Sequence, residues 1–316
     1  MFRRCSILFA GCLGVFSAAA TVSAQQAAHT AALDIRYGKP YVMVMLNGHG
    51  PFRFIIDTGT GGDAFVSAEV ASVLGLPEVG QFHLSDPSGK ASRKVPMVLI
   101  QSLQVAGVEF SGVKAAVHNV GGNSGTCDGL LGFVLFHNYL LTLDYPNRQM
   151  KLTAGDLKAD GGRSVLPFQM PDGIPVVTLD VGGTMIGAQL DSGGAGLSLP
   201  ESMAARMKLT ADSAVLINAH SLSTSFQVKG ATLASDARLG RYTFKHPYVE
   251  INPAFPLANF GSCPMQNFAV TFDQKNALVR FEASKRIFHL STTPVPIRMV
   301  NAPSTQPADP ALVPIG

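Results

Sequence analysis

The sequence of 316 residues contains few charged side chains and few cysteines. Charged residues make up 14% of the chain, and its Lys and Arg residues are not clustered, so neither a nucleic-acid partner nor a membrane-binding face is predicted. Hydrophobic residues, at 47%, favour one or two packed globular domains over disorder. Cys5 and Cys12 lie within residues 1–24, which are interpreted below as a cleaved signal peptide. Cys127 and Cys263 then remain as one potential disulfide, and the sequence does not decide whether they pair.

After residue 24 the chain has no apolar run near the roughly 20 residues that a membrane-spanning helix needs. Residues 1–24 instead have the three parts of a secretory signal peptide: an arginine pair, the apolar stretch 7–20 and a small-residue cleavage site at 22–24. We expect cleavage near Ala24 and a periplasmic or secreted protein. Lipidation at Cys12 is the alternative, although the apolar run before that cysteine is very short.

Motifs for metal or phosphate binding are lacking too. The eight histidines show no metal-ligand spacing. The glycine-rich segment 121–125 lacks the lysine and the following helix that a phosphate-binding loop requires. We therefore expect neither a metal nor a cofactor.

The most informative feature is a pair of tripeptides 134 positions apart, Asp57-Thr58-Gly59 and Asp191-Ser192-Gly193, each at the end of an apolar run. A chain that presents a carboxylate, a hydroxyl and a glycine twice can bring two aspartates together on a pseudo-twofold axis. Two adjacent carboxyl groups disfavour double ionisation, so they can share one proton.

A repeat surrounds these tripeptides. Residues 132–152 align without a gap with residues 261–281, at an offset of 129. The matched polar residues are Asn138, Thr142, Asp144 and Asn147 in the first copy and Asn267, Thr271, Asp273 and Asn276 in the second. Both copies predict a strand, a turn and a returning strand. Asp144 and Asp273 precede the turns, and we interpret them as structural.

Each half of the repeat is predicted to be mostly β with one short helix, at 68–74 and at 201–207. The predicted lobes cover residues 31–153 and 164–282, and the Gly- and Asp-rich segment 154–163 joins them. After residue 282 the chain is rich in proline and weakly patterned, so residues 283–316 are predicted to form a disordered tail.

A second motif follows each tripeptide: Asp128-Gly129-Leu130-Leu131-Gly132 in the first half and Asn259-Phe260-Gly261 in the second. With the doubled tripeptides, these segments resemble the bilobal aspartic peptidases of the pepsin and retropepsin clan, including bacterial retropepsin-like proteins. The resemblance covers nearly all of the chain from the predicted signal peptide to residue 282. It implies a mainly β, bilobal pepsin-like fold made of two retropepsin-like lobes related by a pseudo-twofold axis.

The resemblance also assigns roles to residues. It implies that Asp57 and Asp191 form the catalytic pair, and that the neighbouring residues support the two loops: Thr58, Gly59, Thr60, Ser192 and Gly193. The second half departs from the family pattern at two positions. Gly194 stands where a hydroxyl is expected, and Asn259 stands where an apolar residue is usual.

In this family a hairpin of the first lobe folds over the substrate, and residues 82–94, turning at 86–89, are its candidate here. The segment contains no tyrosine, unlike the hairpin of pepsins. In the second half, the polar segment 218–228 is predicted to line the other side of the cleft.

The sequence thus predicts an aspartic endopeptidase, in which two aspartates activate a water for attack on peptides or unfolded proteins. We expect a monomer, because one chain carries both aspartates. Two alternatives stay open. One is a catalytically inactive peptide- or protein-binding module on the same fold, and the other is a structural protein of the cell envelope that uses the Pro-rich tail for interactions.

Overall fold

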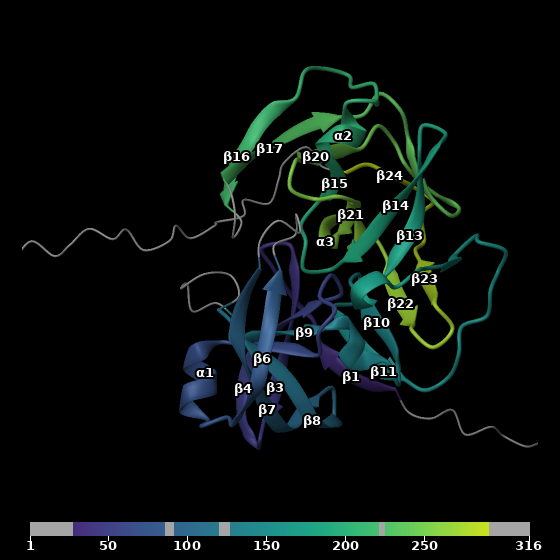
Figure 1. Ribbon diagram of the computed structural model, residues 1–316. Coiled ribbons are helices and arrows are strands. Elements are labelled where there is room, and N and C mark those ends of the chain that lie inside the picture. Colours follow the sequence, from purple (N-terminus) through teal and green to yellow (C-terminus); the bar gives the residue numbers. More distant parts are fainter. Residues whose placement is uncertain (1–27, 86–91, 120–126, 221–224, 291–316) are drawn as a thin grey trace, which may run out of the picture.

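The computed structural model describes residues 28–85, 92–119, 127–220 and 225–290. Its strands form three sheets of eight, ten and six strands (Figure 1). The prediction of a mainly β fold is therefore confirmed. The predicted signal peptide, the glycine-rich segment 121–125 and most of the predicted tail lie outside the described residues.

The eight-stranded N-terminal sheet is drawn in purple to teal in Figure 1. Its strands, in spatial order, are β2 (Asp34–Arg36), β3 (Lys39–Leu46), β4 (His49–Asp57), β9 (Gly129–Gly132), β5 (Ala64–Val66), β8 (Val108–Val117), β7 (Ser92–Val105) and β6 (Glu78–Ser85). The ten-stranded C-terminal sheet consists of β16 (Ala214–His220), β17 (Ser225–Thr232), β20 (Tyr248–Asn252), β15 (Leu197–Pro200), β21 (Ala258–Gly261), β14 (Thr184–Asp191), β13 (Val176–Val181), β18 (Ala237–Leu239), β19 (Tyr242–Phe244) and β24 (Ile287–Phe288).

The two sheets repeat one strand order. The run β3-β4-β9-β5-β8-β7-β6 of the N-terminal sheet corresponds to β13-β14-β21-β15-β20-β17-β16 of the C-terminal sheet. The directions agree as well, because β4 and β9 are parallel, as are β14 and β21, whereas β5 and β15 run antiparallel to β9 and β21. The repeat read from the sequence therefore extends to the topology of the sheets.

The third sheet joins the two halves of the chain (Figure 1). Its order is β1 (His29–Ala32), β11 (Gln149–Thr153), β10 (Leu140–Asp144), β22 (Ala269–Asp273), β23 (Leu278–Glu282) and β12 (Val165–Pro167). The predicted hairpins are thus present as β10–β11 and β22–β23. Where β10 meets β22, Thr142 pairs with Thr271, its counterpart in the repeat, and their hydroxyl oxygens lie 2.9 Å apart. A local twofold relation between the repeats passes through this pair.

The helices are short. They are α1 (Ala68–Val73), α2 (Glu201–Ala204) and α3 (Ser262–Met265), with 3-10 turns at Phe133–Phe136 and Pro171–Gly173. The helix predicted at 68–74 is confirmed, with Ser67 capping its first turn, whereas the one predicted at 201–207 ends three residues earlier. Of the helices that the structure describes, none has the length and apolarity to cross a membrane.

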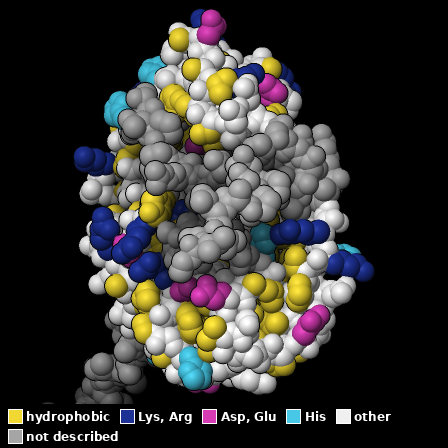
Figure 2. Space-filling view, turned by 90° about the vertical axis from the view of Figure 1, so that its left-hand side faces the viewer, with side chains coloured by type: hydrophobic (Ala, Val, Ile, Leu, Met, Phe, Trp, Pro, Cys, Tyr) yellow, Lys and Arg dark blue, Asp and Glu magenta, His cyan; other side chains and the backbone are white. Residues whose placement is uncertain are grey.

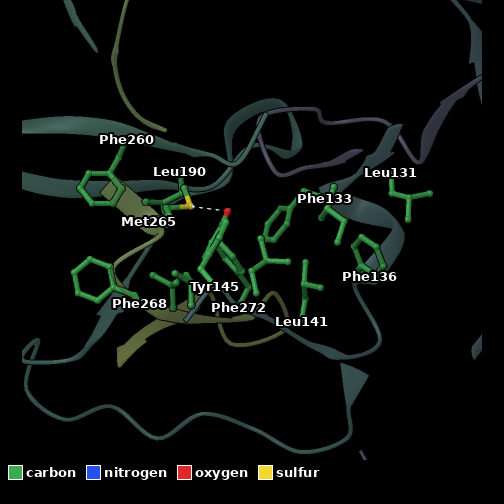
Figure 3. Close-up of a cluster of buried hydrophobic side chains, with 14 of the residues drawn as sticks. Leu131, Phe133, Phe136, Leu141, Tyr145, Leu190, Phe260, Met265, Phe268 and Phe272 are labelled. Atoms are coloured by element: carbon green, nitrogen blue, oxygen red, sulfur yellow. Dashed lines mark hydrogen bonds between the residues drawn. The ribbon is translucent and has the colours of Figure 1, made fainter. Parts of the chain in front are cut away.

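One apolar core extends through both halves of the chain (Figure 3). Phe133, from the first half, and Phe272, from the second, are fully buried with ring centroids 5.1 Å apart. The buried Tyr145 points from the first half toward the second, where its hydroxyl lies 4.0 Å from the sulfur of Met265. Since burial of apolar surface is the main favourable term in folding, this shared core couples the two halves energetically.

The candidate hairpin at 82–94 falls on β6 and β7, and the polar segment 218–228 falls on β16 and β17. β6 pairs with β7 as far as Ser85 and Ser92, and β16 pairs with β17 as far as His220 and Ser225. Residues 86–91 and 221–224 lie outside the described residues. On the face shown in Figure 2, basic and acidic side chains lie at several separate places between apolar ones.

The prediction of a disordered tail from residue 283 is wrong for residues 283–290. Ile287 and Phe288 form β24, which pairs in parallel with β19. Phe288 is buried against the rings of Phe244 and Phe268, with centroids 5.4 Å and 5.0 Å away. This short segment has no strand pattern of its own, and its order comes from the buried ring of Phe288 together with backbone hydrogen bonds from Thr243 and Lys245.

Phe288→Ala is therefore expected to lower the free energy of unfolding by about 3 kcal/mol, because it removes a buried aromatic ring. Ile287→Ala is the matched control from the same strand, since Ile287 is 55% exposed and should change stability by only about 0.5 kcal/mol. Urea unfolding of both variants measures the difference. Equal midpoints would contradict the packing role of Phe288.

Candidate active site

Parallel strand pairs place the two aspartates. β4 ends at Asp57 beside Gly132, the last residue of β9, and β14 ends at Asp191 beside Gly261, the last residue of β21. Both glycines are required because there is no room for a side chain at either position. A Cβ atom at Gly132 would lie 1.8 Å from a backbone oxygen of the loop after Asp57, and one at Gly261 would lie 2.6 Å from a backbone oxygen of the loop after Asp191. The second motif therefore holds each loop in place by close backbone approach.

The two loops hold each other through reciprocal hydrogen bonds. The Thr58 hydroxyl donates to the backbone oxygen of Leu190 at 2.7 Å and accepts from the backbone N–H of Ser192 at 2.9 Å. The Ser192 hydroxyl donates to the backbone oxygen of Ile56 at 2.6 Å and accepts from the backbone N–H of Thr58 at 3.0 Å. Both side chains are fully buried, so each hydroxyl satisfies a donor and an acceptor that water does not reach.

The glycines of the tripeptides bring the carboxyl groups across this interface. A Cβ atom at Gly59 would lie 2.4 Å from the Asp191 carboxyl carbon, and one at Gly193 would lie 2.4 Å from the Asp57 carboxyl carbon. Each carboxyl thus packs against the glycine of the opposite tripeptide. The structure brings together all the residues that the sequence predicts for the site, from Asp57 to Thr60 and from Asp191 to Gly193.

The pKa of Asp57 is raised to about 7. Burial is the largest cause, and the neighbouring Asp191 carboxylate is the next. Lys39 and the Thr60 hydroxyl act in the opposite direction, because they favour the ionised form. The pair therefore retains one proton up to about neutral pH, and that proton belongs to the coupled pair.

The hydrogen bonds to the two carboxylates differ. Asp57 accepts from the backbone N–H of Gly59 at 2.9 Å and from the Thr60 hydroxyl at 3.1 Å. Asp191 accepts from the backbone N–H of Gly194 at 2.8 Å and from the side-chain amide of Asn259 at 2.6 Å. One half uses a hydroxyl and the other an amide for the same task.

Sequence reasoning missed two residues of this site. Asn259 was noted only as a departure from the family pattern, and its bond to Asp191 depends on the pairing of β14 with β21. Lys39, at the start of β3, provides positive charge near Asp57 and belongs to no motif. No signal in the sequence distinguishes Lys39 from a solvated surface lysine.

Asp144 and Asp273 stay outside the site, as predicted. Asp144 accepts from the side chains of Asn147 and Lys151, and Asp273 accepts from the side chain of Asn276 and the backbone N–H of Leu157. Burial raises the pKa of both groups, but these hydrogen bonds outweigh it and leave each pKa below its usual value. The two carboxylates are therefore turn-stabilising anions.

Cys127 and Cys263, which precede and follow the second motifs of the two halves, are free thiols in the structure. The Cys127 thiol donates to the backbone oxygen of Gly129 at 2.8 Å. Burial raises the pKa of both thiols, which keeps them protonated.

Residues 42–135 match the family model of the aspartyl proteases. The matched region begins in β3 and ends after β9, so it includes Asp57 and the first copy of the second motif. Comparison with curated proteins gives no match. Over this region the chain is similar to the aspartyl proteases, which supports an aspartic protease family.

Thr58→Val and Ser192→Ala are each expected to lower the free energy of unfolding by about 1–3 kcal/mol, because each leaves buried backbone groups of the opposite loop unpaired. The double variant should cost less than the sum of the two, since the hydroxyls act in one network. Urea unfolding of the four proteins measures the coupling. The control is Thr178→Val, at an exposed position of β13. Strict additivity would argue against the network.

Stability should fall as the pH rises from about 4 to about 7. In this range the folded state binds more protons than the unfolded state, because the pKa of Asp57 rises from 3.8 to about 7 on folding. Asp57→Asn should make the dependence shallower, whereas the exposed control Asp212→Asn should leave it unchanged. Urea midpoints at several pH values provide the test. Parallel curves for wild type and Asp57→Asn would refute the role of Asp57.

Proposed function

We propose that the protein is an aspartic endopeptidase with a bilobal, pepsin-like architecture, in which Asp57 and Asp191 hydrolyse peptide bonds through an activated water. The observation that carries the proposal is the contact of each carboxyl with the glycine of the opposite tripeptide, 2.4 Å from an added Cβ in both directions. The family match over residues 42–135 supports the same reaction class.

The raised pKa of Asp57 divides the two roles. The coupled pair keeps one proton to about pH 7, and we assign it to Asp57. Asp191 accepts hydrogen bonds from Asn259 and Gly194. In the proposed reaction Asp191 takes a proton from the water as it attacks the peptide carbonyl. Asp57 donates a hydrogen bond to the oxyanion that forms. Sharing of one proton by two close carboxyls is the known pattern of aspartic proteases.

The position of the β6–β7 hairpin supports the proposal that an extended peptide substrate binds beneath it. Its residue Phe82 packs against Phe65 with ring centroids 5.6 Å apart. Phe65 belongs to the same apolar cluster as Leu130, next to the strand that ends at Asp57. The base of the hairpin therefore lies beside the first loop of the site, where a segment folding over a bound peptide would be anchored.

The proposal includes the organisation expected from the sequence: lobes at residues 31–153 and 164–282, acting as a monomer on peptides or unfolded proteins. It also includes export, with a signal peptide cleaved near Ala24 and a periplasmic or secreted product. Because both aspartates belong to one chain, a dimer is not needed to complete the site.

The wild-type protein is expected to cleave an unfolded protein in a pepstatin-sensitive way. Asp57→Asn and Asp191→Asn should each lower the rate by about 10²–10⁴-fold or more, because each removes one partner of the proton transfers. Cleavage from acid to neutral pH, followed by mass spectrometry of the products, measures this. Asp212→Asn, at an exposed position, is the matched carboxylate control and should retain full activity.

Folding of each variant is checked by its urea midpoint. If the folded wild type and both variants show the same lack of cleavage, the enzyme proposal fails and the peptide-binding alternative gains support.

A further inference from the structure

The two halves supply the second hydrogen bond of each aspartate from different positions. Thr60 and Gly194 both stand three residues after their aspartate. Leu130 pairs with Ile55, and Asn259 pairs with Gln189, each two residues before the aspartate. Thr60 with Leu130 in one half therefore corresponds to Gly194 with Asn259 in the other.

Position 194 holds a glycine because a side chain there would clash with its neighbours. Gly194 is not among the glycines with positive φ, so its backbone conformation suits any residue. A Cβ atom there would lie 2.7 Å from Oδ2 of Asp191 and 2.9 Å from Nδ2 of Asn259. A side chain at 194 would therefore meet both the Asp191 carboxyl and the amide at 259, and both would have to move to admit a hydroxyl there.

The side-chain amide of Asn259 lowers the stability of the folded state. Asn259 is 5% exposed, and its Oδ1 atom is buried without a hydrogen-bond partner among the described residues. Leu130, at the matching position, is 6% exposed within an apolar cluster. A buried polar atom without a partner destabilises the folded state, so stability alone favours leucine at both positions. The single bond from Nδ2 to Asp191, at 2.6 Å, is the gain that offsets this cost.

We propose that Asn259 is a positioning residue that replaces the hydroxyl missing at position 194, and that Gly194 and Asn259 act as one exchangeable unit. The inference rests on the proposed function of Asp191. On this proposal the second half still supplies a side-chain donor to its aspartate despite Gly194, because the donor to Asp191 lies on the neighbouring strand β21 and not in the loop.

The amide N–H stabilises the ionised form of Asp191, so its removal should make this carboxyl easier to protonate. The titratable groups around it include the Asp57 carboxyl and, across the core, the Tyr145 hydroxyl, and Lys39 acts on Asp57 from β3. Glu250 and Cys263 lie against the loop after Asp191, at Gly196 and Ala195. None of these groups changes in the variants below. A shift in titration therefore reports the lost amide.

The test compares wild type, Asn259→Leu, Gly194→Ser and the double variant. Asn259→Leu should lower kcat about 10- to 100-fold, the equivalent of one hydrogen bond to a charged group, with little change in KM. The acid limb of its pH profile should move up by about one pH unit. Gly194→Ser alone should also lose activity, because its side chain meets both the Asp191 carboxyl and the amide. The double variant should regain activity and return the acid limb toward the wild-type position.

Carbon-13 NMR titration of the Asp191 carboxyl in the same four proteins gives a readout that needs no cleavage. An upward shift in Asn259→Leu that the double variant reverses would support the positioning role, even if the wild type proved inactive and the proposed function failed. An unchanged titration in Asn259→Leu, or a double variant no better than Asn259→Leu, would overturn the inference. Urea midpoints confirm that each protein is folded.

Discussion

The site depends on the buried hydrogen bonds between the Thr58 and Ser192 hydroxyls and the backbones of the opposite loops. Each hydroxyl donates once and accepts once, so neither loop satisfies its backbone groups without the other. These contacts bring Gly59 against Asp191 and Gly193 against Asp57. The closeness of the two carboxyls follows from this one constraint, and the Asp191 carboxylate then adds to burial in raising the pKa of Asp57.

The arrangement is symmetric in its backbone and asymmetric in its chemistry. The strand order and the parallel pairs repeat, and Thr142 meets Thr271 at the local twofold relation. The donors to the carboxylates do not repeat, because Thr60 serves Asp57 while Asn259 serves Asp191. Repeated backbone geometry places the two acids together, and unequal donors give the two carboxyls of the coupled pair different surroundings.

Much of the fold could be predicted from the sequence because its signals are local. The helix at 68–73, the paired hairpins and the positions of the two aspartates follow from apolar periodicity, turn residues and the repeat. Phe288 shows the limit of such signals. The two-residue strand that contains it has no periodicity, and contacts distant in sequence order it, namely the rings of Phe244 and Phe268 and the pairing with β19.

Two Asp-hydroxyl-Gly tripeptides at matching points of a duplicated, mainly β chain can be recognised without coordinates, since spacing and pattern are properties of the chain. The hydrogen bonds of the carboxyls, the place of Lys39 near Asp57 and the replacement by Asn259 of the hydroxyl missing at 194 depend on the folded protein. The physical reason is that these hydrogen bonds, 2.6–3.1 Å long and between residues up to 136 positions apart, depend on strand register and on burial. Neither can be inferred from a short run of neighbouring residues.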